Sequence, residues 1–325
     1  MSRRRAPGAS IESFADDIVI APDETFDGTF PFAPHFSEAP GFRMHYVDEG
    51  HRTPGSAVVC LHGEPTWGYI YRKFIGPLAR AHRVIVPDHM GFGKSETPQD
   101  REYTLRTHVE NLTSLIDDLE LTDITFVAQD WGGLMSGAYT VRHPDRVKRL
   151  CLTNTMCAYG LIGRDDLPPI KESPWFRWIA EGYESGRTEA ILANLGSTVI
   201  DVMKILGFEN SSVIDDAWIR AYSTPFPTRE ECKGAVAFPL DVHLDRNWDY
   251  LAEGFSGVGA LKSKPAMLAV GMRDRALPPE TVIADFKALW PRGPVVELPH
   301  AGHFSQEDAP EILVALIQQF IQMTG

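Results

Sequence analysis

Short apolar runs that alternate with helix-like segments are the feature of this sequence that most restricts its fold. Seven runs rich in β-branched and apolar residues predict strands at 42–50, 57–63, 83–88, 124–130, 147–155, 265–274 and 294–299. Apolar residues recur with the helical period at 104–121, 278–290 and 310–323. Alternation of this kind is typical of a mostly parallel sheet covered by helices on both faces. The sequence therefore predicts the α/β class.

The alternation stops for about a hundred residues after the fifth run. This part is rich in tryptophan, tyrosine and proline, and it contains amphipathic stretches such as "SPWFRWIAEGY" (173–183). There, Ser173 is placed to cap a helix whose first residue is Pro174. We therefore predict a core domain formed by 1–155 and 246–325, and a helical cap domain, 156–245, that lies over the ends of the strands.

Composition and charge limit the partners of the chain. Its 325 residues carry a formal net charge of −13, and the short basic run "RRR" at 3–5 does not offset this, so we expect no nucleic-acid partner. The sequence shows neither the apolar region of a secretory signal nor a run of membrane-spanning length. The four cysteines lack the spacing of a zinc site or a disulfide framework: Cys60, Cys151, Cys157 and Cys232. We expect a soluble cytoplasmic protein with no metal or organic cofactor.

An aspartate occupies the centre of a sharp turn in "FVAQDWGG" (126–133), where an apolar run ends and a glycine-rich segment begins. Small residues, Ala128 and Gly132, flank Asp130 at positions −2 and +2, as a crowded strand-to-helix turn that exposes a nucleophile requires. Asp130 is thus a candidate nucleophile. The alternative is that its carboxylate only caps the following helix.

Two other loops hold partners for such a nucleophile. "LHGEPTW" (61–67) follows an apolar run and supplies a turn whose backbone N–H groups can form an oxyanion hole. "PHAGHFSQED" (299–308) places His303 in a loop after the last predicted strand, where a general base would lie. His300 is the nearby alternative, and its place at the end of the strand favours a structural role.

A histidine base needs a carboxylate that holds its tautomer and stabilises its charged form. Asp274, at the end of "AVGMRD", follows the next-to-last predicted strand and fits the chain order nucleophile, acid, histidine. Alternatively, Asp274 caps a loop or pairs with Arg273 or Arg275. We predict a catalytic triad of Asp130, Asp274 and His303.

Four motifs together resemble those of a known family. "HGEPTW", "DHMGFGKS" (88–95), "QDWGG" and "AGHFSQED" are similar to the motifs of haloalkane dehalogenases, which belong to the α/β-hydrolase superfamily. The resemblance extends from about residue 40 to the end of the chain. It implies an α/β-hydrolase fold with a helical cap, and hydrolysis of small uncharged haloalkanes to an alcohol and a halide ion. We expect a monomer whose partners are the haloalkane, water and the halide.

The residue types specify a mechanism for this activity. A carboxylate suits displacement at an sp³ carbon, so Asp130 would release the halide and retain the alkyl group as an ester. His303, held by Asp274, would then activate water to attack the ester carbonyl. The backbone N–H groups of Glu64 and Trp131 would form the oxyanion hole, and the indole N–H of Trp131 would bind the halide.

The resemblance also implies roles for several residues of the cap. Its pattern favours Trp178 as the second halide donor and Trp175 as a wall of the pocket, although either ring can simply pack in a core. Phe226 and Pro227 line the cavity or form a stiff turn. The Glu64 side chain lies close to another carboxylate, so it either points away into hydrogen bonds or helps to place water.

Other functions remain open at this point. Epoxide hydrolases use the same nucleophile and need cap tyrosines, for which Tyr183 and Tyr222 are candidates. Similar folds also serve as luciferase-like oxygenases or as non-catalytic ligand receptors. Fluoroacetate dehalogenases have a basic residue after the nucleophile, which binds the carboxylate of the substrate. This chain has Trp131 at that position, so a charged haloacid is not the expected substrate.

Overall fold

The computed structural model describes residues 19–161 and 170–325. Eight strands form one sheet in the order β1-β2-β4-β3-β5-β6-β7-β8. Strand β2 pairs antiparallel with both of its neighbours, β1 and β4, and the remaining pairs are parallel. The strands are β1 (His35–Ser37), β2 (Met44–Gly50), β3 (Ser56–Leu61), β4 (Arg83–Pro87), β5 (Asp123–Gln129), β6 (Val147–Thr153), β7 (Ala266–Gly271) and β8 (Val295–Leu298). Each of the seven predicted runs overlaps a strand. The short edge strand β1 was not predicted.

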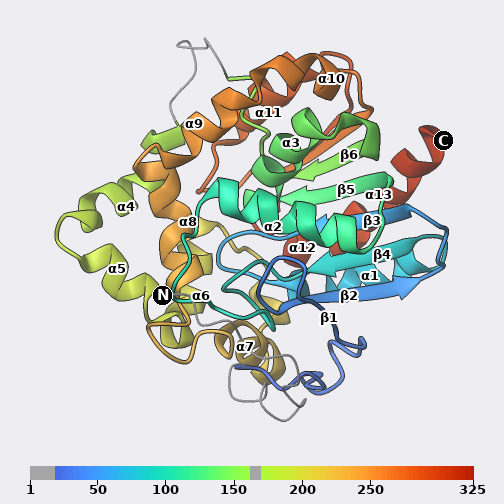
Figure 1. The fold of residues 1–325 in the computed structure, drawn as a ribbon. Helices are drawn as coiled ribbons and strands as arrows, with labels where there is room; N and C mark the ends of the chain where they lie inside the picture. The colour runs from blue at the N-terminus through green and yellow to red at the C-terminus, as the bar shows by residue number, and fades with distance from the viewer. Residues whose placement is uncertain (1–18, 162–169) are drawn as a thin grey trace, which may run out of the picture.

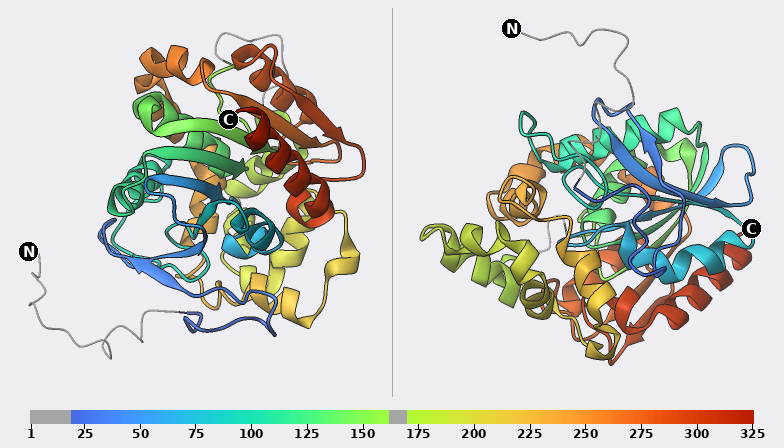
Figure 2. Two further views of the ribbon diagram at one scale, coloured as in Figure 1. Left: turned by 90° about the vertical axis from the view of Figure 1, so that its right-hand side faces the viewer. Right: turned by 90° about the horizontal axis from the view of Figure 1, so that it is seen from below.

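Helices cover both faces of this sheet (Figures 1 and 2). Helices α1 and α13 lie on one face, while α2 and α3 pack together on the other. The helices outside the predicted cap are α1 (Arg72–Ala79), α2 (Leu105–Asp118), α3 (Trp131–Arg142), α9 (Arg246–Glu253), α10 (Val258–Lys262), α11 (Pro279–Leu289), α12 (Ser305–Asp308) and α13 (Pro310–Met323). No helix of the described residues is long and apolar enough to cross a membrane.

The described residues between β6 and α9 form helices and no strand. These helices are α4 (Pro174–Tyr183), α5 (Arg187–Leu192), α6 (Leu195–Leu206), α7 (Asp216–Ser223) and α8 (Lys233–His243). Figure 1 shows them grouped beyond one end of the sheet. Helix α4 begins as predicted, because the Ser173 side chain accepts a hydrogen bond of 3.3 Å from the backbone N–H of Phe176. The cap boundaries 156 and 245 stay a prediction.

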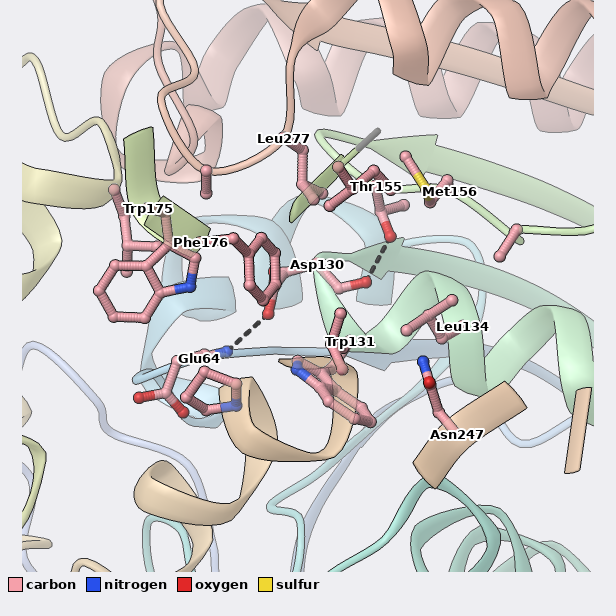
Figure 3. Close-up of a pocket in the computed structure, with 16 residues that line it drawn as sticks. Glu64, Asp130, Trp131, Leu134, Thr155, Met156, Trp175, Phe176, Asn247 and Leu277 are labelled. Carbon is pink, nitrogen blue, oxygen red and sulfur yellow. Dashed lines mark hydrogen bonds between the residues drawn. The ribbon is translucent and has the colours of Figure 1, made fainter. Parts of the chain in front are cut away.

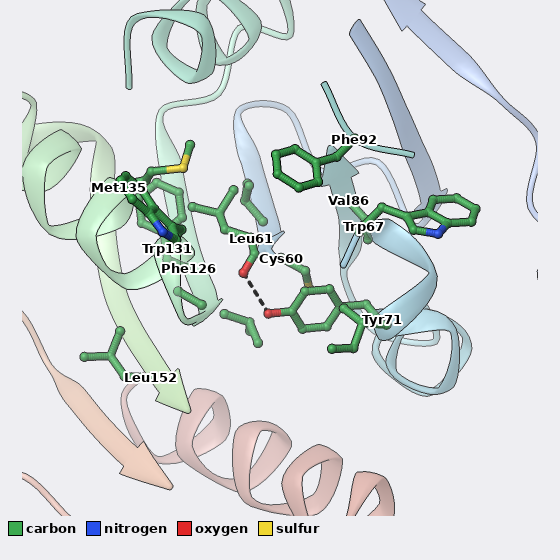
Figure 4. Close-up of a cluster of buried hydrophobic side chains, with 14 of the residues drawn as sticks. Cys60, Leu61, Trp67, Tyr71, Val86, Phe92, Phe126, Trp131, Met135 and Leu152 are labelled. Atoms are coloured by element: carbon green, nitrogen blue, oxygen red, sulfur yellow. Dashed lines mark hydrogen bonds between the residues drawn. The ribbon is translucent and has the colours of Figure 1, made fainter. Parts of the chain in front are cut away.

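A buried cluster beneath the ends of the central strands fixes the start of the first functional loop (Figure 4). The hydroxyl of Tyr71, which is fully buried, donates a hydrogen bond of 2.9 Å to the carbonyl oxygen of Leu61. Leu61 is the last residue of β3, so this bond holds the strand end that leads into Gly63 and Glu64.

Three buried histidines lie next to this loop. The rings of His62 and His89 stack with centroids 4.0 Å apart, and the His108 ring lies 4.7 Å from Phe238. Burial lowers the pKa of each: that of His89 to about 4, and those of His62 and His108 well below the usual value. Neither ring nitrogen of His108 has a hydrogen-bond partner among the described residues. Protonation of this cluster is therefore unfavourable in the folded protein.

These histidines predict acid sensitivity. Below about pH 6.5 the unfolded chain takes up protons that the folded protein excludes, so stability falls as the pH decreases. His108→Phe removes one such site, and we expect the free energy of unfolding to decrease less steeply on acidification, by up to about 1.4 kcal/mol per pH unit. Urea unfolding at several values between pH 7 and 5 measures this slope. His51→Gln, in an exposed position, is the matched control and should keep the wild-type slope; an unchanged slope in His108→Phe would contradict the prediction.

Candidate active site

Asp130 lies at the tip of a strained turn between β5 and α3. Its φ is 49°, a left-handed value that is uncommon for a residue other than glycine and is associated with functional turns. A Cβ atom on Gly132 would lie 2.3 Å from the Leu61 carbonyl oxygen, so the turn needs glycine at this position. The Asp130 side chain makes no capping bond to α3. The capping alternative is therefore wrong, and the carboxylate is free for another role.

The three residues of the predicted triad lie together. His303 Nδ1 is 2.9 Å from Asp274 Oδ2, and His303 Nε2 is 3.3 Å from Asp130 Oδ2. His303 is fully buried. His300 is exposed and lies 3.3 Å from a nitrogen of Arg273, outside this cluster. The imidazole of His303 thus bridges a buried carboxylate and the turn carboxylate.

Asp274 is held by donors from two strand ends. Its Oδ1 accepts from the backbone N–H groups of Ala276 and Leu277 at 2.8 and 2.9 Å. Its Oδ2 accepts from the side-chain amide of Asn154 at 2.9 Å. Asn154 follows β6 and also exchanges two hydrogen bonds with the backbone of Gly271, at the end of β7. Asn154 was not predicted from the sequence, and its position near the end of a predicted strand was the available signal.

The charge of the site favours a protonated His303 in the free protein. Burial lowers the pKa of His303, but the carboxylates of Asp274 and Asp130 outweigh this effect and raise it to about 10. The side-chain amide of Gln129, at the end of β5, lies 3.0 Å from His303 Nε2. Gln129 is fully buried, and this polar residue in an apolar strand was not recognised from the sequence.

Glu64 contributes both its backbone and its side chain to the site (Figure 3). Its backbone N–H donates a hydrogen bond of 2.8 Å to Asp130 Oδ1, as an oxyanion-hole donor would. Its carboxyl group points away from Asp130, is buried, and has no hydrogen-bond partner among the described residues. Burial, followed by the charge of Asp130, raises the pKa of Glu64 well above its usual value. The neutral form of Glu64 is therefore favoured relative to that of an exposed glutamate.

A cavity of about 90 Å³ lies above Asp130 and is mostly apolar. Trp131 and Trp175 both line it. Its other walls include Leu134, Thr155, Met156, Ala158, Ile170, Phe176, Leu206, Pro239, Val242, Asn247, Ala276 and Leu277. An engineered cavity of about 150 Å³ accommodates benzene, so this cavity suits a smaller molecule.

The two cap tryptophans, predicted as a halide donor (Trp178) and a wall of the pocket (Trp175), lie at different places relative to the cavity. Trp175 lines the cavity, and Trp178 does not. Trp178 is half-buried, and its ring stacks on that of Trp175 with centroids 5.2 Å apart. Positions three apart lie on the same side of α4, and the packing of that helix brings Trp175 to the cavity.

Phe226 and Pro227 also lie elsewhere. Both line a separate hollow next to α6 and α7, and the Phe226 ring packs 6.1 Å from that of Phe92. The prediction that they line the cavity is wrong, since the stiff turn that they form packs against the body of the protein. Pro239, from α8, lines the cavity in their place.

The segment that contains α6 supports the loop of His303. The backbone N–H of His303 donates a hydrogen bond of 2.7 Å to the carbonyl oxygen of Gly207, just after α6. The backbone N–H of Arg275 donates to the carbonyl oxygen of Leu206 at 3.0 Å. A Cβ atom on Gly302 would lie 2.1 Å from the Gly207 oxygen, so the two backbones are in close contact. The position of the base thus depends on this helix.

No group of three or more His, Cys, Asp or Glu side chains among the described residues is arranged to hold a metal ion. The four cysteines are buried and unpaired. Burial raises the pKa of Cys151 to about 12.

Comparisons with known proteins agree with this fold and site. A family model described as alpha/beta hydrolase fold matches residues 56–310. A haloalkane dehalogenase of Psychrobacter cryohalolentis is 34% identical over 94% of this chain and 98% of its own length. A solved structure of a haloalkane dehalogenase from Paraglaciecola agarilytica, described as tetrameric, superposes with a TM-score of 0.73 at 30% identity, over 91% of this chain and 96% of that one. A cis-3-alkyl-4-alkyloxetan-2-one decarboxylase of Xanthomonas campestris is 31% identical over 87% of this chain and 93% of its own length.

The fold and the arrangement of the site define this chain as an α/β-hydrolase. Within that superfamily, it belongs to the haloalkane dehalogenase family. The predicted fold class and family are therefore confirmed.

The contact between His303 and Asp274 predicts a measurable change in acidity. Asp274→Asn removes a negative charge 2.9 Å from His303 Nδ1, so we expect the pKa of His303 to fall below its wild-type value of about 10. Nuclear magnetic resonance titration of protein with labelled histidine measures this. An unchanged or higher His303 pKa in the variant would contradict the assigned pairing.

Proposed function

We propose that this protein hydrolyses small uncharged haloalkanes to an alcohol and a halide ion. The observation that carries the proposal is the Asp130 carboxylate at the base of an apolar cavity, 3.3 Å from the ring of His303 and beside two indole groups, those of Trp131 and Trp175. A charged substrate would lose its hydration in this cavity, and none of the described residues that line it has a basic side chain to pair with such a substrate.

In the first step, Asp130 attacks the halogen-bearing carbon and an ester forms as the carbon–halogen bond breaks. The departing halide takes up negative charge in a cavity where little water can reach it. The indole N–H groups of Trp131 and Trp175 are donors without a competing acceptor on the same side chain, and both line the cavity. They stabilise the halide as it leaves.

In the second step, water attacks the ester carbonyl. Esterification neutralises Asp130 and so removes one of the two charges that raise the pKa of His303. The imidazole then releases its Nε2 proton more readily and accepts one from water, while Asp274 stabilises the charged ring. The backbone N–H of Glu64, already bonded to Asp130 Oδ1, stabilises the oxyanion, and Trp131 at the N-terminus of α3 supplies the second donor.

We also propose that the protein acts in the cytoplasm as a monomer, with the haloalkane, water and halide as its partners. The net charge of −13 supports the absence of a nucleic-acid partner. Analytical ultracentrifugation tests the monomer, and a tetramer like that of the Paraglaciecola relative is the outcome that would refute it.

Decarboxylation of an oxetanone is the second candidate function. It is supported by the Xanthomonas relative, whose name states that reaction. Release of CO₂ from a cis-dialkyl oxetanone, without halide release from any haloalkane, would favour it. The luciferase-like and receptor alternatives have less support, because the complete cluster of Asp130, Asp274 and His303 suits hydrolysis.

The covalent step can be tested by blocking the second one. In His303→Gln we expect water activation to fail, so that the protein releases one equivalent of bromide from a short bromoalkane and retains the alkyl group. Mass spectrometry of peptides locates the added mass, which should lie on Asp130. Sustained bromide release by this variant, or an adduct on another residue, would refute the assigned roles.

The two cap tryptophans form a matched pair for testing the halide site. Trp175→Phe removes a donor that lines the cavity, and we expect the turnover number for a chloroalkane to fall on the order of 10²-fold. Trp178→Phe removes an indole N–H outside the cavity and should have a much smaller effect. Steady-state halide release measures the turnover number of each variant. A larger loss in Trp178→Phe would support Trp178, rather than Trp175, as the second halide donor.

A further inference from the structure

The carboxyl group of Glu64 stands apart from the other buried acids of this protein. Only 3% of the Glu64 residue is exposed, and neither side-chain oxygen has a hydrogen-bond partner among the described residues. Asp274 accepts from backbone and side-chain donors, and Glu307 is paired with Arg72 and the hydroxyl of Tyr222. Buried polar groups without partners are costly and uncommon, and dehalogenation as proposed uses only the backbone of Glu64.

The position of this carboxyl group indicates what it can act on. Glu64 lines the same cavity as Asp130. Figure 3 shows its carboxyl group extending away from Asp130, on the side of the cavity where Trp175 lies. In an in-line displacement the leaving atom departs on the side opposite the attacking oxygen. The Glu64 carboxyl group therefore lies on the side of Trp175, where the proposed function places the leaving atom.

The protonation of Glu64 agrees with this position. Burial and then the neighbouring Asp130 raise the pKa of Glu64 well above its usual value, which favours the neutral form. A neutral carboxyl has one O–H donor. A halide leaves without a proton, whereas an alkoxide is strongly basic and leaves readily only when an acid protonates it.

We propose that Glu64 is a general acid for substrates whose leaving atom is oxygen, and that this site also opens epoxides. The proposal rests on the nucleophile of the proposed function. Asp130 forms a bond to one ring carbon, the carbon–oxygen bond breaks, and the Glu64 O–H proton passes to the ring oxygen. Water activated by His303 then releases a diol, and the proton taken up by His303 returns through solvent to Glu64. The net reaction is epoxide plus water to diol.

The tyrosines expected for epoxide opening are not placed for it. Tyr183 is 40% exposed. The hydroxyl of Tyr222 donates a hydrogen bond of 2.7 Å to Glu307, and neither residue lines the cavity. Apart from the nucleophile Asp130, Glu64 is therefore the acid that the described residues lining the cavity offer.

The test measures the first step alone, in the His303→Gln protein that retains the covalent adduct. The full-length variant is incubated with 1-bromopropane or with 1,2-epoxypropane, and the adduct on Asp130 is followed over time by mass spectrometry. We expect adducts from both substrates. Adding Glu64→Gln should slow formation of the epoxide adduct about 100-fold more than that of the bromide adduct. The control Tyr222→Phe, in the same background, should keep the ratio of the two rates.

The pH profile gives a second readout that needs no change at Glu64. In His303→Gln, alkylation by the epoxide should slow as the pH rises and Glu64 ionises, relative to alkylation by the bromide. The ratio of the two rates corrects for changes in Asp130 that affect both substrates.

The outcomes separate the two proposals. A bromide adduct without an epoxide adduct, or equal slowing of both by Glu64→Gln, overturns the role of Glu64 and leaves dehalogenation intact. An epoxide adduct that depends on Glu64, without a bromide adduct, supports the acid and refutes dehalogenation. No adduct from either substrate refutes both. A Tyr222→Phe variant that selectively loses epoxide alkylation assigns the acid to the tyrosine and also overturns the proposal.

Discussion

The buried carboxylate of Asp274 is the group on which the rest of the site depends. A charge removed from water is tolerated only when donors surround it, and Asp274 is met by two backbone N–H groups, the amide of Asn154 and the ring of His303. These donors come from the segments that follow β6, β7 and β8. One carboxylate thus joins three strand ends, and the orientation that it gives to His303 brings Nε2 within 3.3 Å of Asp130.

Much of the fold and of the reacting centre could be predicted because the signals are local. Runs of apolar residues with regular breaks predict strands whatever their neighbours, and the parallel arrangement brings their carboxyl ends to one edge. Asp130, Asp274 and His303 each follow a predicted strand, so their meeting follows from topology. The edge strand β1 has only three residues and no periodic pattern, and it was missed for that reason.

The cavity walls could not be predicted, because they depend on how helices dock. Trp175 and Trp178 differ by less than a turn of α4, and only the tertiary packing decides which indole faces the cavity. Phe226 is an aromatic residue of the kind that often lines a pocket, yet its ring packs near that of Phe92 instead. The raised pKa of Glu64 is likewise caused by burial and by the neighbouring Asp130, and neither can be read from "HGEPTW".

The hydrogen bond from the His303 backbone to the carbonyl oxygen of Gly207 limits how far this protein can be simplified. His303 is fully buried, so excising the helices between β6 and α9 would remove the acceptor that holds its backbone N–H and would open its loop to water. A minimal version with the sheet and triad alone would therefore lose the geometry of its base along with its substrate cavity. Efforts to graft a different cap onto this core must reproduce the backbone turn at Gly207 before they alter any side chain that meets the substrate.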